Sequence, residues 1–130
     1  SATRFRDGLA AFAETRPVHG ECGGHMVLGQ WLEDAESTRH RMTGLLGHAT
    51  SFAKRRLTLG YREARLLADG AIGGKGAIVR GHEFHYSTMA EAGDDAPLAE
   101  ISDASGASLG LAGGRRGHIT GSWFHAIARA

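Results

Sequence analysis

The apolar positions in the first quarter of the chain predict two helices around one short strand. Phe5, Leu9 and Phe12 recur at helical spacing, which predicts a helix over residues 3–15. Pro17 ends this helix, because proline disfavours a helical conformation in the residue before it. A very short strand, a sharp turn and a second helix follow, over residues 17–20, 20–24 and 25–33.

The rest of the chain predicts strands joined by polar or glycine-rich loops. The expected strands cover residues 42–46, 57–67 with a break at Gly60, 77–86 and 98–101. The expected loops cover residues 34–38, 69–76 and 90–97. Residues 109–111 and 118–120 predict a hairpin with a glycine-rich tip. Because no repeat or linker divides the sequence, a single domain is expected.

Composition narrows the classes of protein to which the chain can belong. It has 130 residues, 42% hydrophobic and 22% charged, which excludes a disordered or collagen-like chain. The net charge is +1, and the clusters Lys54-Arg55-Arg56 and Arg115-Arg116 are typical of a solvated surface. We therefore expect neither nucleic acid nor a membrane as partner. One cysteine and no apolar run near ~18 residues predict a cytoplasmic protein without an internal disulfide.

The glycine-rich turn over residues 20–24 carries the clearest chemical signal. An apolar strand leads into Gly-x-Cys-x-Gly and a helix follows, which is the cysteine form of the nucleophile elbow. Such a strained turn raises the Cys22 side chain out of the backbone, and Gly20 and Gly24 are expected to relieve crowding there. The helix start favours a thiolate, which suits acyl transfer. The alternative is that Cys22 is a small buried hydrophobic residue.

A cysteine nucleophile needs a base, which is usually a histidine from another part of the chain. The sequence has eight histidines. Two lie in polar or turn surroundings and are expected to be solvated, namely His40 and His48. Two are local to the turn, namely His19 and His25. The others are His82, His85, His118 and His125. The residue pattern alone leaves His125 and His85 equally placed as the base.

Four motifs together resemble one family of enzymes. They are Gly20-Glu-Cys-Gly-Gly-His-Met-Val-Leu-Gly29, Leu59-Gly-Tyr-Arg62, Arg80-Gly-His-Glu-Phe-His-Tyr-Ser87 and Gly121-Ser-Trp-Phe-His125. Their order and spacing are similar to the class I glutamine amidotransferase domain of the cobyrinic and hydrogenobyrinic acid a,c-diamide synthases. The resemblance implies an α/β fold with a flavodoxin-like open sheet and flanking helices. It also implies glutamine hydrolysis that supplies ammonia to ATP-activated corrin carboxylates in cobalamin biosynthesis.

The resemblance implies roles for individual residues. Cys22 is the nucleophile, His125 is its base, and the backbone amides of Gly23 and Gly24 stabilise the oxyanion. Many class I relatives carry a glutamate two residues after the histidine, where this chain has Ile127. The resemblance therefore implies a Cys–His dyad instead of a triad.

Other residues of these motifs are expected to line or support the site without reacting. They are Glu21, His82, Glu83, His85 and Tyr86. Met26 stands where many relatives carry a glutamine that touches the substrate, so the glutamine contacts differ here. Cys22-x-x-His25 and His82-x-x-His85 have the spacing of metal ligands, but residues three apart on a strand point to opposite faces. We therefore expect no metal.

The resemblance also implies an N-terminal synthetase domain that binds ATP, Mg²⁺ and the corrin precursor. Residues 73–76 lack the spacing and hydroxyl of a phosphate loop, so that domain is expected to be absent here. Residues 1–130 then form the C-terminal portion of an amidotransferase domain that is truncated at its N-terminus. Such a chain is expected to hydrolyse glutamine poorly alone and to pair with another copy or the remainder of its parent chain. The rival interpretation is a non-catalytic binding or assembly module.

Overall fold

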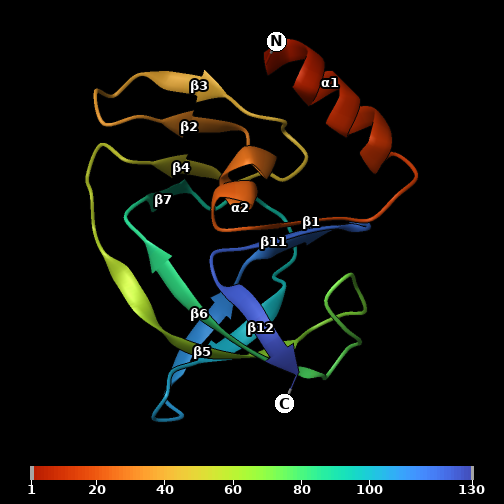
Figure 1. Cartoon of the computed structure of the whole chain (residues 1–130), viewed down its shortest axis with the longest axis vertical. Helices are drawn as coiled ribbons and strands as arrows, with labels where there is room; N and C mark the ends of the chain where they lie inside the picture. Colours follow the sequence, from red (N-terminus) through yellow and green to blue (C-terminus); the bar gives the residue numbers. More distant parts are fainter. Residues whose placement is uncertain (1, 130) are drawn as a thin grey trace.

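The computed structural model describes residues 2–129, and Ser1 and Ala130 lie outside the described residues. Within that range the chain forms two helices and twelve strands (Figure 1). The helices are α1 (Ala2–Ala13) and α2 (Gly23–Leu28). The strands are β1 (Val18–Glu21), β2 (Trp31–Glu33), β3 (Arg39–Arg41), β4 (Ala49–Ser51), β5 (Thr58–Leu66), β6 (Ile78–His85), β7 (Thr88–Glu91), β8 (Ala99–Ser102), β9 (Ser108–Ala112), β10 (Gly114–Arg116), β11 (Ile119–Ser122) and β12 (His125–Arg129). Neither described helix has the length and apolar character needed to cross a membrane.

The first sheet has the order β1-β11-β10. It pairs one strand from the N-terminal part of the chain with two strands from the C-terminal part. β1 pairs with β11 in parallel, from Val18 opposite Ile119 to Glu21 opposite Ser122. β10 is antiparallel to β11. Because the carboxyl ends of parallel strands meet at one edge of a sheet, the segments that follow Glu21 and Ser122 begin side by side.

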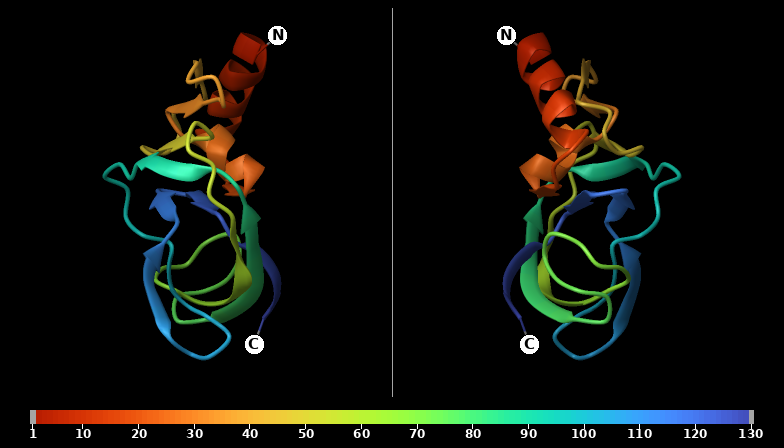
Figure 2. Two further views of the ribbon diagram at one scale, coloured as in Figure 1. Left: turned by 90° about the vertical axis from the view of Figure 1, so that its left-hand side faces the viewer. Right: turned by 90° about the vertical axis from the view of Figure 1, so that its right-hand side faces the viewer.

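The second sheet has the order β12-β6-β5-β8-β9, and all its neighbouring strands are antiparallel. β12 pairs with β6, so that His125 lies opposite His82, and β6 pairs with β5, so that His82 lies opposite Tyr61. Figure 2 shows that this sheet is strongly curved. The third sheet, β3-β2-β4-β7, lies toward the end of the molecule that holds α1 (Figure 1).

Two hydrophobic clusters form the core of the described residues. One lies inside the curved second sheet and consists of Ala64, Leu66, Val79, Leu98, Ala99, Ile101 and Phe124. The other joins the helices to the first sheet and consists of Ala13, Leu28, Leu46 and Ile119. Phe124 is 1% exposed, and its carbonyl oxygen accepts a hydrogen bond of 2.8 Å from the Ser122 hydroxyl. The residue next to His125 is therefore anchored in the core.

The expectation of a second helix over residues 25–33 is correct up to Leu28 and wrong beyond it. Gly29 has extended backbone, and Trp31 begins β2. A Cβ atom at Gly29 would lie 2.5 Å from the carbonyl oxygen of His48, so the chain passes too close to this loop for another side chain. The apolar residues that suggested a longer helix belong to a strand instead.

Two further expectations about strands are wrong. Residues 42–46 form a loop between β3 and β4 rather than a strand. β5 continues through Gly60 without a break, because Gly60 pairs with Glu83 of β6. The expected loop over residues 90–97 also begins inside β7.

The expected hairpin between residues 109–111 and 118–120 does not form. β9 pairs with β8, whereas β10 pairs with β11. Gly113, which has a positive φ of 71°, separates β9 from β10 and lets the chain turn from one sheet into the other. The α/β class is confirmed in the coarse sense that helices and several sheets are present together.

Candidate active site

Cys22 lies at a strained turn between β1 and α2. Its φ and ψ are 52° and −107°, a conformation that non-glycine residues rarely adopt. The turn is held on both sides, because the Cys22 N–H donates to the Ser122 carbonyl at 2.9 Å and the Cys22 carbonyl accepts from the Met26 N–H at 3.1 Å. The prediction of a strained strand-to-helix turn at Cys22 is confirmed.

The two glycines that flank the turn have different roles. A Cβ atom on Gly20 would lie 2.6 Å from the carbonyl oxygen of Gly24 and 2.8 Å from a methyl carbon of Leu28. Gly20 is therefore required for the close approach of α2 to β1, as the sequence predicts. The same expectation for Gly24 is wrong, because a Cβ atom there would meet no atom within 4 Å.

The Cys22 thiol faces the end of β6. The side chain is partly buried, and its thiol donates to the carbonyl oxygen of Phe84 at a distance of 3.7 Å. His125 begins β12, which pairs with β6, and its imidazole is 44% exposed. Both residues therefore follow the carboxyl ends of the parallel strands β1 and β11 and lie beside β6. The role of His125 as base stays a prediction.

Glu21 connects the nucleophile turn to the segment of His125. One carboxylate oxygen, Oε1, lies 3.8 Å from Nδ1 of His125. The other, Oε2, accepts a hydrogen bond of 2.9 Å from the N–H of Ala126 and lies 3.2 Å from Nε2 of His19. Nδ1 of His19 in turn lies 2.7 Å from the Thr120 hydroxyl. The sequence names Glu21 as a supporting residue, but its contact with the His125 imidazole cannot be read from the motif.

His85, the other candidate base, has both ring nitrogens occupied. Nε2 lies 3.0 Å from the carboxylate of Glu83 and Nδ1 lies 3.0 Å from the carbonyl oxygen of Ser87. Both partners are acceptors, so each nitrogen donates when both bonds form. Burial alone would raise the pKa of Glu83, but the hydrogen bond from His85 and the charges of Arg62 and His85 together lower it. This arrangement favours His85 as part of a buried ion cluster.

His25 and His48 are buried together behind the turn. They are 1% and 3% exposed, and their rings stack with centroids 4.0 Å apart. The expectation that His48 is solvated is therefore wrong, whereas His40 is indeed exposed. Nε2 of His48 lies 2.7 Å from the His25 carbonyl oxygen. Burial and the neighbouring His48 lower the pKa of His25 to about 3, so this imidazole is neutral near pH 7.

The remaining predicted site residues lie on the exposed face of β6 and just after it. Exposure alternates along β6, with His82 and Phe84 outward and Glu83 inward. His82 lies beside His125, with ring centroids 5.6 Å apart, and Tyr86 stacks edge-on against Phe84 at 5.8 Å. His82 thus lies next to His125, and Tyr86 packs on the ring of Phe84, whose carbonyl oxygen accepts from the Cys22 thiol.

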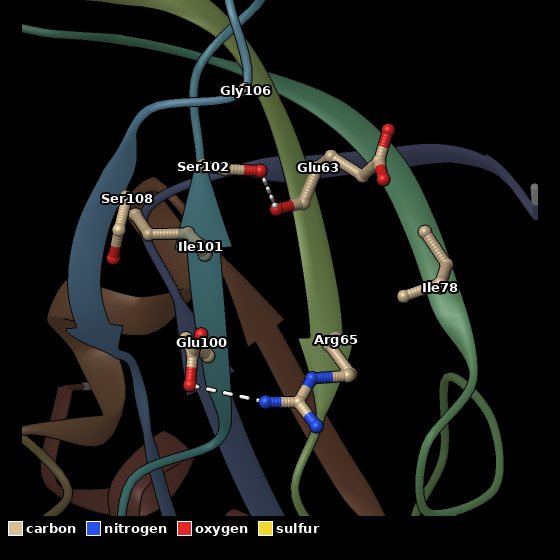
Figure 3. A pocket seen from close by; sticks show the side chains of 8 residues that line it. All are labelled: Glu63, Arg65, Ile78, Glu100, Ile101, Ser102, Gly106 and Ser108. Atoms are coloured by element: carbon tan, nitrogen blue, oxygen red, sulfur yellow. Dashed lines mark hydrogen bonds and ion pairs between the residues drawn. The ribbon is translucent and has the colours of Figure 1, made fainter.

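A separate hollow lies on the second sheet, away from the predicted site residues. Its volume is about 250 Å³. Figure 3 shows its lining, which consists of Glu63, Arg65, Ile78, Glu100, Ile101, Ser102, Gly106 and Ser108. Arg65 and Glu100 satisfy each other there through an ion pair of 3.1 Å. None of these residues belongs to the predicted machinery of Cys22 and His125.

The geometry gives no support to the metal alternative. Within residues 2–129, no three side chains of the metal-binding types are grouped as ligands. His82 lies on an exposed position of β6, and His85 points toward Glu83 on the other face. The two histidines therefore do not converge on one ion.

A strained cysteine between a parallel strand and a short helix, with a histidine after the adjacent strand, suits glutamine amidotransfer. The chain belongs to the family of CobB/CobQ-like glutamine amidotransferase domains, whose model matches residues 1–130. It is similar to proteins named hydrogenobyrinate a,c-diamide synthase. Identity is 61% over 130 residues with the protein of Mesorhizobium japonicum, 61% over 128 with that of Rhodobacter capsulatus and 56% over 128 with that of Agrobacterium fabrum.

These alignments cover almost all of this chain but a minor part of each relative. They span 98–100% of the chain and 29–30% of the length of those three relatives. The comparisons therefore confirm the resemblance drawn from the four sequence motifs.

Proposed function

We propose that this chain is the glutamine-hydrolysing part of a hydrogenobyrinate or cobyrinate a,c-diamide synthase. The observation that carries the proposal is the strained backbone of Cys22, with φ 52° and ψ −107°, at the carboxyl end of β1. Strain of this kind persists where it presents a reactive side chain. The names of the relatives support the choice of reaction.

In the proposed reaction, Cys22 attacks the side-chain amide carbon of glutamine. His125 takes the thiol proton and then donates a proton to the leaving nitrogen. The C–N bond breaks, ammonia leaves, and a glutamyl thioester forms on Sγ. Water then attacks the thioester with His125 as base, which releases glutamate and restores the thiol.

The start of α2 supplies the proposed oxyanion donors. The first N–H groups of a helix have no partner within it, and Gly23 and Gly24 are the first residues of α2. Because a Cβ atom on either glycine would meet nothing within 4 Å, the backbone is open to approach there. One such donor is worth about 10²–10³ in rate.

We propose that ATP, Mg²⁺ and the corrin precursor are bound by the remainder of a longer synthase. Residues 73–76 do not fit an ATP phosphate site, because they join the antiparallel strands β5 and β6 and no helix follows. The Lys75 N–H instead donates to Asp69 at 2.8 Å. No step of the proposed glutamine chemistry therefore involves a nucleotide.

The parallel pair of β1 and β11 supports a proposal about the wider fold. We propose that it belongs to the flavodoxin-like central sheet of a class I amidotransferase. The other strands of that sheet come from the remainder of the synthase or from a second copy. The reaction is assigned to the cytoplasm, in keeping with the single unpaired cysteine.

The experiment that tests this function is labelling by a glutamine-analogue electrophile. The protein is incubated with 6-diazo-5-oxo-norleucine and digested, and the adduct is located by mass spectrometry. We expect one adduct on Cys22, its suppression by excess glutamine, and its absence from Cys22→Ser. A folded protein that is not labelled would instead support the non-catalytic binding module.

The base is tested by ammonia release from glutamine. We expect His125→Ala to lower kcat by about 10²-fold or more, the range that general acid–base catalysis supplies. His40→Ala is the matched control, because His40 is an exposed histidine far from the turn in sequence. Equal activity of His125→Ala and the unmodified protein would overturn the assignment of the base.

A further inference from the structure

We propose that Glu21 is the positioning residue for His125 and replaces the glutamate that many class I relatives carry two residues after the histidine. This inference rests on the proposed function of Cys22 and His125. In this proposal the carboxylate comes from β1, which precedes the nucleophile, and not from β12, which holds the base.

The contacts of Glu21 fix its carboxylate beside the His125 imidazole. Oε2 accepts from the Ala126 N–H at 2.9 Å, so the carboxylate is tied to the backbone of β12 one residue after His125. Oε1 then faces Nδ1 of His125 at 3.8 Å, an ion-pair separation. Catalytic hydrogen bonds are often long before substrate binds and shorten in the complex.

A second histidine, His19, also contacts the Glu21 carboxylate. Nε2 of His19 lies 3.2 Å from Oε2, and Nδ1 lies 2.7 Å from the Thr120 hydroxyl. His19 and Glu21 are 14% and 25% exposed, whereas His125 is 44% exposed. A chain of contacts therefore links the buried Thr120 of β11, through His19 and Glu21, to the more exposed imidazole of His125.

The position that many relatives fill with glutamate is unsuited to this task here. Ile127 is 67% exposed, and the register of β12 shifts between Ala126 and Ala128. The shift is a β-bulge, which redirects side chains locally. Glu21 reaches the imidazole from β1, where it lies opposite Ser122 of the parallel strand that leads to His125.

The proposed role follows from charge. When His125 takes the thiol proton on Nε2, the imidazolium keeps its other proton on Nδ1, directed at Oε1 of Glu21. The carboxylate selects this tautomer and stabilises the imidazolium without accepting the proton itself. Two further ionisable groups, His82 and His19, lie next to His125 and Glu21. Glu21 is the acidic group among them.

The test compares Glu21→Gln with Glu14→Gln, a control at an exposed glutamate just after α1. In the full-length synthase, we expect Glu21→Gln to lower the kcat of glutamine hydrolysis by about 10²-fold with little change in KM. We expect Glu21→Asp to recover part of this loss and Glu14→Gln to match the unmodified protein. Unchanged kcat in Glu21→Gln would overturn the proposal.

A second readout separates positioning from loss of structure. Alkylation of Cys22 by iodoacetamide is followed from pH 6 to pH 10. We expect Glu21→Gln to react about tenfold more slowly near pH 7 and at the rate of the unmodified protein near pH 10, where a free cysteine is ionised. Slower alkylation at every pH would indicate a damaged turn and would overturn the positioning role.

The proposed function can fail separately from this inference. If His125→Ala and Cys22→Ser both leave glutamine hydrolysis unchanged, the proposed function itself is wrong. If those variants are inactive and Glu21→Gln is fully active, the role of Glu21 alone is wrong. In the His125→Ala background, we expect Glu21→Gln to cause no further loss, since its effect acts through that imidazole.

Discussion

Trp123 lies flat against the imidazole of His85, with ring centroids 4.2 Å apart and planes 22° from parallel. The same indole meets the ring of His25 edge-on at 5.3 Å. Trp123 thereby contacts both the ion cluster that contains His85 and the buried pair of His25 and His48. Because His125 follows two residues later, the segment that carries the proposed base rests on both groups.

The ion cluster of Arg62, Glu83 and His85 should be essential for stability. Arg62 Nε lies 3.2 Å from Glu83, and their side chains are 12% and 10% exposed. We expect Arg62→Met to destabilise the fold by about 3 kcal/mol, because it leaves a buried carboxylate with one partner fewer. Arg65 lies on the same strand, β5, as Arg62. Arg65→Met breaks its exposed pair with Glu100 of β8 and should cost less than about 1 kcal/mol. Urea unfolding of both variants measures the difference, and equal losses would contradict the prediction.

Stability should fall in mild acid because of His25. Its pKa is about 3 in the folded chain, whereas an unfolded histidine has a pKa of 6.5. Below pH 6.5 the unfolded chain binds a proton that the folded chain excludes, so stability is lost as pH falls from 6.5 toward 3. We expect a contribution of about 1.4 kcal/mol per pH unit. His25→Leu should flatten the stability profile in this window, and His40→Leu should retain the loss.

Gly20 should tolerate no side chain. A Cβ atom there would lie 2.6 Å from backbone of α2, so either β1 or α2 must move. We expect Gly20→Ala to destabilise the fold by about 2 kcal/mol through overpacking. Gly8→Ala is the matched control, because Gly8 is a helical glycine with no atom within 4 Å of its Cβ position and should gain about 0.5–1 kcal/mol. Thermal unfolding distinguishes them, and a neutral Gly20→Ala would show that the turn is adaptable.

The strained backbone at Cys22 should lower the stability of the fold by a measurable amount. Cys22→Gly relieves the positive φ of 52°, and we expect it to stabilise the fold by about 1 kcal/mol while abolishing labelling. Cys22→Ser keeps the side chain and should match the unmodified protein in stability. Ser37→Gly relieves a positive φ of 64° at a residue outside the Cys22 turn. It should therefore stabilise the fold without loss of labelling at Cys22. A destabilised Cys22→Gly would contradict the presence of strain.

The sequence predicted the backbone of the Cys22 turn better than the pairing of the strands. Gly20 and Cys22 form a local motif whose backbone demands can be read directly from neighbouring residues. By contrast, Trp31 and Leu32 continue a helical spacing, and the end of α2 at Leu28 is set by the distant loop at His48. Tertiary contacts of this kind override the local pattern, so the pattern alone does not predict β2.

The contact of Glu21 with His125 could not be predicted for a related reason. It depends on the parallel register of β1 with β11, on the β-bulge in β12 and on the Ala126 N–H, and none of these has a signature in the motif. The polar or turn surroundings of His48 in the sequence predict a solvated side chain. In the structure that turn folds over α2 and buries the imidazole.

The pairing of β1 with β11 also determines when the site can form during folding. His19 and Thr120, which meet across this pair, are 101 residues apart in the sequence. Closing so long a loop is slow and entropically costly, so contacts of this kind form late. Chain synthesis proceeds from the N-terminal end, and β1 leaves the ribosome long before β11 exists. The hydrogen bond from the Cys22 N–H to Ser122 therefore cannot form until the C-terminal strands have docked, and the proposed hydrolysis of glutamine can begin only after that step.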